Sequence, residues 1–431
     1  MKSTVISGAA AMAFCVSLAF ATPAACGQTP APPSSAAAAD PIAALVGQLA
    51  LEKYKATIKA LTQFGDRRQG TERNRKALDW IEAQLKSYGC TNTERLQYQY
   101  TQPAPRAPAP ARPPAPPGGR GGPAGQGGSI LFGNRMPTGV NDDPMLQPDA
   151  GIRALDAEQT PPGTSMRENV YCTKIGTAHP EEMYIVSAHM DGIGFGEAAN
   201  DNGSGTALVM ELARIFSAPG VETGRSIRFA LWNNEETGLN GARAYVEQRK
   251  DLQGIESPPG SGKYPEPKWL GMIQHDMMLW DHGMPIPRLD AAGQPVLDAK
   301  GQPVYGSPKE QRREADVNIE FQSLSKQADA SARLAWALHA ANGKYASDYP
   351  AAVGPHMTNT DSTPFMDLVP AISLRENERG MQIGAGWDPN WYQPSDVFGT
   401  YSDQDFRLGL NAAQTTLAGV AQLSGARMKG K

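Results

Sequence analysis

Hydrophobic and polar residues follow two different periods along this chain. Over residues 41–64 the apolar side chains recur at helical spacing, and a second helical face covers residues 72–88 and ends at Gly89. From residue 93 onwards, short apolar runs of strand length separate further helical segments. The pattern therefore predicts a protein in which strands and helices alternate.

The predicted strands cover residues 93–100, 169–174, 183–188, 226–232, 269–274 and 369–374. The predicted helices between and after them cover residues 204–216, 239–249, 324–341 and 406–423. This alternation is typical of an α/β fold with helices on both faces of the sheet. Because such folds gather their ligands at the carboxyl ends of the strands, polar residues just past each strand are the candidates for a functional site.

The remaining segments define the predicted domain organisation. Residues 1–26 have the features of a signal peptide, and residues 27–40 form a linker rich in Pro, Ala and Ser. We expect one domain over residues 41–431, interrupted by a disordered insertion at residues 102–128 that has almost nothing to bury. Strand-like sequence resumes on both sides of the insertion, which indicates a surface loop within one domain.

The amino-terminal segment predicts export. It carries one lysine, then a mostly apolar run over residues 5–21, then small residues. The run is too short for a transmembrane span, so we predict none and expect a periplasmic or extracellular protein. Cys26 follows two alanines, so a lipid anchor at this residue is the alternative to a freely secreted protein.

Net charge and cysteine content bear on the possible partners and on the disulfides of the protein. The formal net charge of -4 shows no basic excess, which argues against a nucleic-acid partner. Of four cysteines, Cys15 would leave with the signal peptide, and Cys90 and Cys172 are the candidates for one bridge. Two buried free thiols are an equally open interpretation.

One predicted strand end and the loop that follows it carry the first candidate residues. His189 and Asp191 close the strand over residues 183–188, and a metal-binding histidine commonly needs a carboxylate to orient its ring. Asp201 lies in the loop that precedes the next helix, where it is either a helix cap or a metal ligand.

The next two strands end in carboxylates as well. Glu235 and Glu236 are adjacent, so they should repel each other unless a cation compensates them or they are exposed at the start of a helix. Asp276 ends the strand over residues 269–274. Since all these positions fall at one edge of the predicted sheet, their convergence favours a metal site.

These residues lie in four motifs, namely His-x-Asp (His189, Asp191), Asp-Asn-x-Ser-Gly (Asp201 to Gly205), Asn-Glu-Glu-x-Gly (Asn234 to Gly238) and the later Asp276. With them the chain resembles the zinc-dependent exopeptidase family of bacterial leucyl aminopeptidases, plasma glutamate carboxypeptidase and glutaminyl cyclases. The resemblance covers roughly residues 41–423 apart from the insertion. It implies a three-layer α/β/α fold with a mostly parallel mixed sheet, the phosphorylase/hydrolase-like zinc exopeptidase fold, and makes residues 41–431 a metallopeptidase catalytic domain.

The resemblance also implies roles for the candidate residues. Two zinc ions would be bridged by Asp201, with His189 and Asp276 completing one site and Glu236 serving the other. Asp191 would orient His189. Glu235 would be the general base that takes a proton from the attacking water. Histidine and carboxylate ligands both suit zinc.

The chain departs from the family at its last metal ligand. The family has a histidine in a Tyr-His-x-x-x-Asp stretch, and the matching stretch here, residues 390–397, has Tyr392 in its place and Asp396 as the late aspartate. A neutral phenol is a poor zinc ligand. Three outcomes are open: the enzyme works with one ion, another residue fills in, or the activity has drifted. The candidate replacements are His356, His282 and Gln393.

The resemblance implies a secreted zinc metallo-exopeptidase that hydrolyses terminal peptide bonds of peptide substrates. We expect an aminopeptidase, because the short and largely low-complexity connection between the first two strands leaves little room for the lid domain of the larger carboxypeptidase relatives. The alternatives are a carboxypeptidase or dipeptidase, as the spacing of His356 and Asp361 indicates, and a non-catalytic binding protein with an incomplete metal pair.

Overall fold

An eight-stranded mixed sheet forms the centre of the protein. The computed structural model describes residues 40–90, 92–104, 139–281, 288–301, 303–304, 317–355, 359–376 and 388–429. Residues Asp40–Lys431 form one compact unit. The predicted signal peptide, Cys26, and nearly all of the predicted linker and insertion lie outside the described residues, so these predictions stay predictions.

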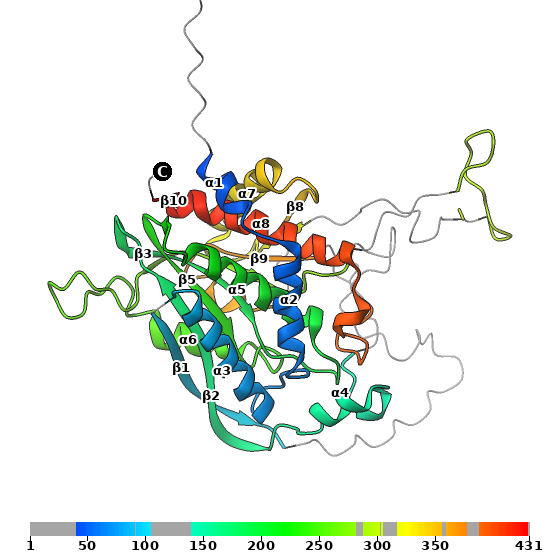
Figure 1. Ribbon diagram of the computed structural model, residues 1–431, viewed down its shortest axis with the longest axis horizontal. Coiled ribbons are helices and arrows are strands. Elements are labelled where there is room, and N and C mark those ends of the chain that lie inside the picture. The colour runs from blue at the N-terminus through cyan, green and yellow to red at the C-terminus, as the bar shows by residue number, and fades with distance from the viewer. Residues whose placement is uncertain are drawn as a thin grey trace, which may run out of the picture. The chain divides into compact units, whose positions relative to one another are not determined.

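In spatial order the strands are β1 (Thr93–Gln102), β2 (Gly163–Lys174), β5 (Arg225–Trp232), β3 (His179–His189), β6 (Lys268–His275), β9 (Ala371–Glu376), β7 (Val317–Phe321) and β8 (Ala351–Gly354). The four central strands β5, β3, β6 and β9 are parallel. Strands β1, β2 and β7 pair antiparallel with their inner neighbours, and β8 is parallel to β7 (Figure 1). The predicted fold class, a three-layer α/β/α arrangement around a mixed sheet, is confirmed.

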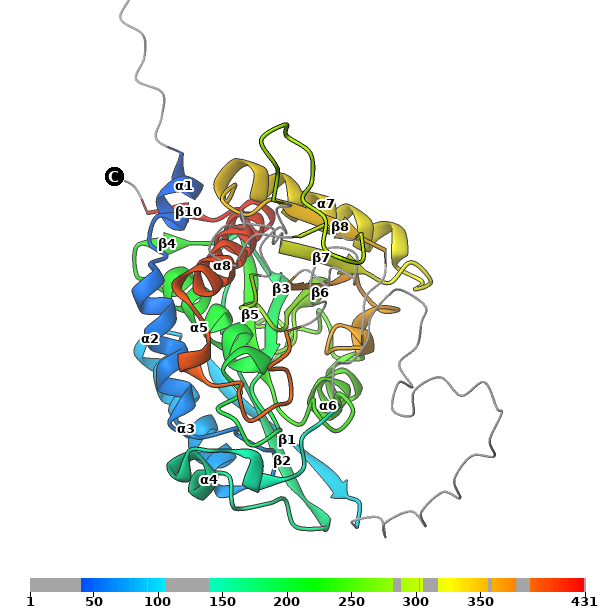
Figure 2. The same cartoon turned by 90° about the vertical axis from the view of Figure 1, so that its right-hand side faces the viewer.

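The helices are α1 (Pro41–Val46), α2 (Leu51–Thr62), α3 (Glu72–Ser87), α4 (Ala150–Leu155), α5 (Gly205–Phe216), α6 (Asn240–Arg249), α7 (Ala328–Tyr345) and α8 (Asp403–Ser424). A small second sheet pairs β4 (Val221–Glu222) with β10 (Arg427–Met428). Figure 2 shows α2, α5 and α8 on one side of the central strands and α6 on the other.

Alternating side chains of each strand feed two separate cores. On β3, Val186 and Ala188 face the larger core, which α3, α5, α7 and α8 cover, whereas Ile185 faces the smaller core around α6. This alternation is the two-residue period of a strand buried on both faces. The same period places His275 and Asp276 on opposite faces of the sheet.

Two predicted helices differ from the observed ones, and two strands of the main sheet were not predicted. The helix predicted over residues 41–64 is two helices, α1 and α2, separated by residues 47–50. The helix predicted from residue 324 begins at Ala328. Strands β7 and β8 were missed because β7 alternates buried polar with apolar residues and β8 has four residues. In β7 the Asn318 amide donates a 2.7 Å hydrogen bond to Glu320, which satisfies both buried groups.

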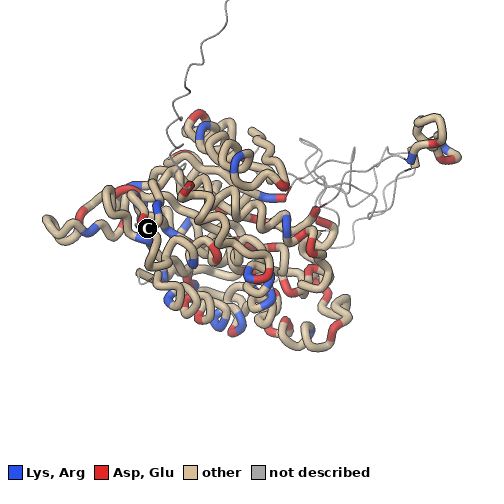
Figure 3. The backbone as a smooth tube through the Cα atoms, turned by 45° about the horizontal axis from the view of Figure 1, so that its top comes forward, with Lys and Arg blue, Asp and Glu red and all other residues tan. Residues whose placement is uncertain are grey.

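A disulfide joins Cys90, just beyond α3, to Cys172 on β2, with their Cα atoms 5.9 Å apart. The structure thus favours the bridge over two free thiols. None of the helices in the described part of the chain is long and apolar enough to span a membrane. In the view of Figure 3, acidic and basic residues are interspersed along the backbone, in keeping with the weakly negative net charge.

Candidate metal centre

A pocket opens at the carboxyl ends of the parallel strands, where the sequence predicts the functional site. Its walls are His189, Asp201, Glu235, Glu236, Gly238, Asp276, Met277, Asn359, Arg375, Trp391 and Tyr392. His189, Asp201, Glu236 and Asp276, the four residues predicted as metal ligands, therefore share one pocket. They come from the ends of β3, β5 and β6 and from the loop before α5.

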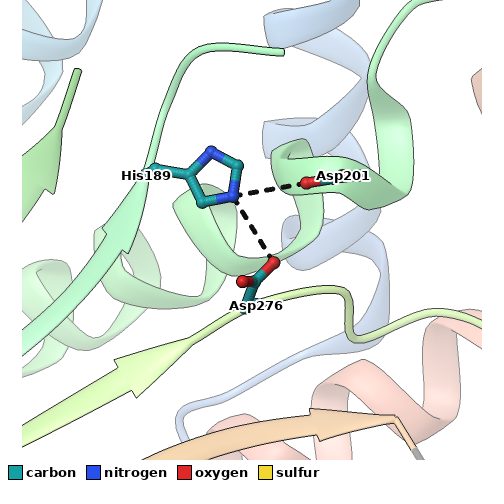
Figure 4. Close-up of side chains that lie close together, drawn as sticks. All are labelled: His189, Asp201 and Asp276. Carbon is teal, nitrogen blue, oxygen red and sulfur yellow. Dashed lines mark ion pairs between the residues drawn. The ribbon is translucent and has the colours of Figure 1, made fainter. Parts of the chain in front are cut away.

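His189 lies between two aspartates at the bottom of this pocket. Its Nε2 atom is 3.3 Å from Oδ1 of Asp201 and 3.4 Å from Oδ1 of Asp276 (Figure 4). The three side chains are almost completely buried. One donor atom from each residue lies within 4.8 Å of the other two, which is a spacing that a single metal ion can bridge.

The main chain of Asp191 orients the His189 ring. Its carbonyl oxygen lies 3.0 Å from Nδ1 of His189, so this nitrogen carries the proton and donates it. The Asp191 carboxylate lies farther from the same nitrogen, at 3.8 Å, and its Oδ1 accepts a 3.1 Å hydrogen bond from the backbone N–H of Glu235. Asp191 therefore connects the ends of β3 and β5, and it leaves Nε2 of His189 directed at the two aspartates.

Hydrogen bonds to the backbone around Asp201 hold this residue in place. The segment Ala199–Ser204 is a distorted helical turn, and the buried Asp396 carboxylate accepts hydrogen bonds from the N–H groups of Asn200 at 2.8 Å and Asp201 at 3.1 Å. Helix α5 then begins at Gly205, where a Cβ atom would lie 2.6 Å from the carbonyl oxygen of His275. A glycine is thus required for α5 to approach the end of β6 this closely.

Each aspartate has one oxygen directed at His189 and the other bound by a donor from elsewhere in the chain. Oδ2 of Asp276 accepts hydrogen bonds from Thr360 Oγ1 at 2.6 Å and from Arg375 at 3.1 Å. Oδ2 of Asp201 accepts a hydrogen bond of 2.5 Å from the indole N–H of Trp391. Each of the two carboxylates therefore has one oxygen available for a metal ion beside His189.

A tight turn after β5 places the two glutamates. Asn234 adopts a φ of 64°, a conformation that asparagine accepts more readily than most residues. The N–H groups of Gly238 and Leu239 both donate to the carbonyl oxygen of Glu235 at 2.8 Å, which closes the turn. Glu235 is buried, and together with Glu236 and His189 it forms a second group of side chains whose donor atoms lie within 4.8 Å of one another.

The electrostatics of the pocket reflect an excess of carboxylates. Burial opposes the charge of His189, but the carboxylates of Glu235 and Asp276 outweigh burial and raise the pKa of His189. Burial, supported by neighbouring carboxylates, raises the pKa values of Glu235 and Glu236. Burial acts in the same direction on Asp276, yet His189 and Arg375 hold its pKa below the usual value. A divalent cation would relieve this repulsion.

The residues present fit a zinc ion. Imidazole nitrogen and carboxylate oxygen are ordinary zinc ligands, and three protein ligands with an open position are the usual set of a catalytic zinc site. His189, Asp201 and Asp276 supply such a set. Glu235 lies beside them, and neither carboxylate oxygen of Glu236 has a hydrogen-bond partner among the described residues.

The segment around Tyr392 lies next to these candidate ligands, as the resemblance to the family predicts. Tyr392 lines the pocket, and burial together with the carboxylates of Glu236 and Asp201 raises its pKa. Gln393, one candidate replacement ligand, donates instead to the carbonyl oxygen of Gly139 at 2.9 Å. The other two candidates, His282 and His356, lie outside the described residues.

Sequence reasoning missed two polar residues that bind Asp276. Arg375 is at the end of β9, so the rule that strand ends carry function would have indicated it. Thr360 lies in a loop, and no sequence signal marks it. The indole N–H of Trp391 binds Asp201 from a segment that lies 190 positions away in sequence.

Comparison with known proteins identifies a family for this region. Residues 169–284 match Peptidase family M28. The matched segment runs from β2 to just beyond β6 and contains all six residues predicted for the catalytic and metal site. It ends well before Tyr392.

Two relatives match shorter segments. The chain is 36% identical over 125 residues to the protein named "Probable lipoprotein aminopeptidase LpqL" of Mycobacterium tuberculosis, covering 29% of this chain and 23% of that protein. It is 33% identical over 89 residues to Carboxypeptidase Q of Xenopus laevis, covering 20% of this chain and 19% of that protein. The similarity thus spans less than a quarter of the length of either relative.

A solved structure extends the similarity of fold over most of the chain. An aminopeptidase from Aneurinibacillus sp. strain AM-1 superposes with a TM-score of 0.53 and 18% sequence identity, covering 90% of this chain and 96% of that one. At this identity the superposition shows a shared fold. Residues 169–284 thus match Peptidase family M28, within a fold that is shared with this aminopeptidase over most of the chain.

Proposed function

We propose that this protein is an exported zinc metallo-exopeptidase that hydrolyses terminal peptide bonds, and that it acts as an aminopeptidase. One observation carries the proposal: His189, Asp201 and Asp276 meet around one point, with Glu235 beside them in the same pocket. Peptide hydrolysis by a zinc enzyme needs a metal-binding set and an adjacent base. The relative and the solved structure that are named as aminopeptidases support the same activity.

Each residue has a proposed task. Zinc held by His189, Asp201 and Asp276 would supply the Lewis acidity that activates water and polarises the scissile carbonyl. Glu235 accepts the proton of the attacking water and delivers it to the leaving amine. Asp191 positions both partners, because its carbonyl oxygen binds His189 and its carboxylate binds the backbone of Glu235.

The charge of the pocket supports cleavage at the amino end. Four carboxylates line it, from Asp201, Glu235, Glu236 and Asp276, against the two basic side chains of His189 and Arg375 among the lining residues. Arg375 lies 3.1 Å from Asp276, so part of its charge is already neutralised. The remaining negative charge favours a substrate that presents a protonated α-amino group over one that presents a free carboxylate.

A carboxypeptidase or dipeptidase is the second candidate, and Arg375 is the observation that favours it. A guanidinium group in the pocket wall is the side chain best suited to bind a terminal carboxylate. The relative named Carboxypeptidase Q shows that the sequence similarity extends to proteins with that name.

The test compares two substrate sets on the same zinc-loaded protein. Aminoacyl p-nitroanilides have a free amino end only, and amino-acetylated dipeptides have a free carboxyl end only. We expect turnover of the anilides, suppression by a chelator and recovery on addition of zinc. Turnover of the acetylated peptides alone would establish the carboxypeptidase. Cleavage of unblocked dipeptides alone would establish a dipeptidase, and a folded, zinc-bound protein that cleaves none of these substrates would support the non-catalytic binding protein.

A further inference from the structure

We propose that the centre holds one zinc ion, and that the place of a second ion is closed by Trp391 and Tyr392. The inference rests on the proposed function, because it concerns the metal content of the same pocket. It departs from the two-ion centre that the family resemblance implies. Three features of the pocket carry it.

The first feature is the orientation of the Asp201 carboxylate. A carboxylate that bridges two ions must offer one oxygen to each of them. In this structure Oδ1 of Asp201 faces His189 at 3.3 Å, and Oδ2 accepts the indole N–H of Trp391 at 2.5 Å. A hydrogen bond of this length to a charged acceptor is strong. Oδ2 of Asp201 is therefore bound to Trp391 and is not available to a second ion.

The second feature is that Tyr392 is fixed where the missing ligand would lie. Its backbone carbonyl accepts a 3.0 Å hydrogen bond from the N–H of Asn141, and its ring packs against Trp391 with centroids 4.4 Å apart. A Cβ atom on Gly194 would lie 2.6 Å from the Tyr392 carbonyl, so the two backbones are in close contact. The backbone and the ring of Tyr392 are therefore both held beside the pocket.

The third feature is that no second histidine reaches the pocket among the described residues. The chain has six histidines, of which the structure describes His179, His189, His275 and His339. Of these four, His189 alone lines the pocket. His275 faces α8, where its Nε2 lies 2.8 Å from Thr416. Gln393 is bound to Gly139 on the outer side of the turn.

The result is an asymmetric pocket. On one side, His189, Asp201 and Asp276 each direct a donor atom at the same point. On the other side, Glu236 lies near the phenol of Tyr392, and a neutral phenol is a poor zinc ligand. With one ion held by His189, Asp201 and Asp276, Glu236 is left as a carboxylate of the pocket wall that faces the substrate.

The experiment counts zinc ions per chain in the full-length protein. The protein is dialysed against buffered zinc, and its metal content is measured by mass spectrometry beside a thermal unfolding curve that verifies folding. We expect one ion in the wild type and one in Glu236→Gln, because Glu236 is not a ligand. We expect two ions in the double variant Trp391→Phe/Tyr392→His, which frees Oδ2 of Asp201 and restores the histidine. The double variant Trp391→Phe/Tyr392→Phe is the matched control and should bind one zinc ion.

Each contrary outcome has a distinct meaning. Two ions in the wild type, with one lost in Glu236→Gln, would overturn the one-ion centre and leave the proposed peptidase function standing. A folded double variant that still holds one ion would overturn the assignment of Trp391 and Tyr392 as the closing groups. A wild-type protein that binds no zinc and cleaves no peptide would instead overturn the proposed function itself.

Discussion

The guanidinium group of Arg375 lies 3.1 Å from Oδ2 of Asp276, the carboxylate whose other oxygen faces His189 at 3.4 Å. The contact joins the ends of two neighbouring strands, β9 and β6. It orients a proposed metal ligand and partly neutralises its charge. Outer groups of this kind commonly set metal affinity.

Replacing Arg375 should therefore weaken zinc binding. We expect Arg375→Met to lower zinc affinity by about 10- to 100-fold, because Asp276 loses a partner that orients it. Competition with a fluorescent zinc chelator measures the effect. Arg375→Lys keeps the charge but loses the planar guanidinium group. Its zinc affinity should lie between those of Arg375→Met and the wild type. Equal affinity in Arg375→Met and the wild type would mean that the contact does not orient the ligand.

Glu235 gives the sharpest test of the proposed mechanism. Glu235→Gln preserves the shape of the side chain but cannot accept a proton, so we expect kcat to fall by about 10²- to 10⁴-fold. Zinc content should stay unchanged, since Glu235 is not in the group around Asp201 and Asp276. Steady-state hydrolysis of an aminoacyl anilide and metal analysis of the same sample measure both quantities. A parallel loss of zinc would assign Glu235 to metal binding.

Removal of zinc should destabilise the protein. Without a cation, the carboxylates around His189 repel one another in a buried site. A ligand present at 100 times its dissociation constant stabilises the folded state by about 2.7 kcal/mol, so a chelator should lower the unfolding midpoint and added zinc should restore it. Asp276→Asn is the matched control, and its midpoint should respond much less to zinc.

The disulfide should contribute strongly to stability. Cys90 and Cys172 are both buried and are separated by 82 positions in sequence, so the bridge closes a long loop of the unfolded chain. We expect the double variant Cys90→Ala/Cys172→Ala to lose about 2–5 kcal/mol of unfolding free energy, measured by urea denaturation. Reduction of the wild type should give a similar loss, whereas the reductant should leave the double variant unaffected.

His275 should make stability depend on pH. Burial lowers its pKa from 6.5 to about 4, so the folded protein favours the neutral ring. A depressed histidine pKa gives stability that is present above pH 6.5 and is lost as the pH falls towards 4, because the unfolded chain binds the extra proton. The shift corresponds to about 3 kcal/mol.

A substitution isolates this contribution from the carboxylates that titrate in the same range. His275→Gln should lose less unfolding free energy than the wild type between pH 7 and pH 4, measured by urea denaturation at each pH. His179→Gln, at an exposed position, is the control and should follow the wild type. A pH dependence in His275→Gln identical to the wild type would show that another group is responsible.

Much of the fold follows from local sequence. The period of apolar residues predicts the central strands and the helices between them, because strands buried on both faces read as continuous apolar runs. Strand β8 was missed because it has four residues, and β7 because two of its five residues are the buried polar Asn318 and Glu320. The break between α1 and α2 was missed for a related reason, as both segments continue the same apolar period.

The sequence by itself determined which residues gather at the site. His189, Asp201, Glu235, Glu236 and Asp276 all follow strands or precede a helix, and parallel strands bring their carboxyl ends to one edge. Only the tertiary structure decided which oxygen of each aspartate is available. That choice depends on Trp391 and Arg375, which reach Asp201 and Asp276 from distant segments, and hydrogen bonds over such separations leave no periodic trace in the sequence.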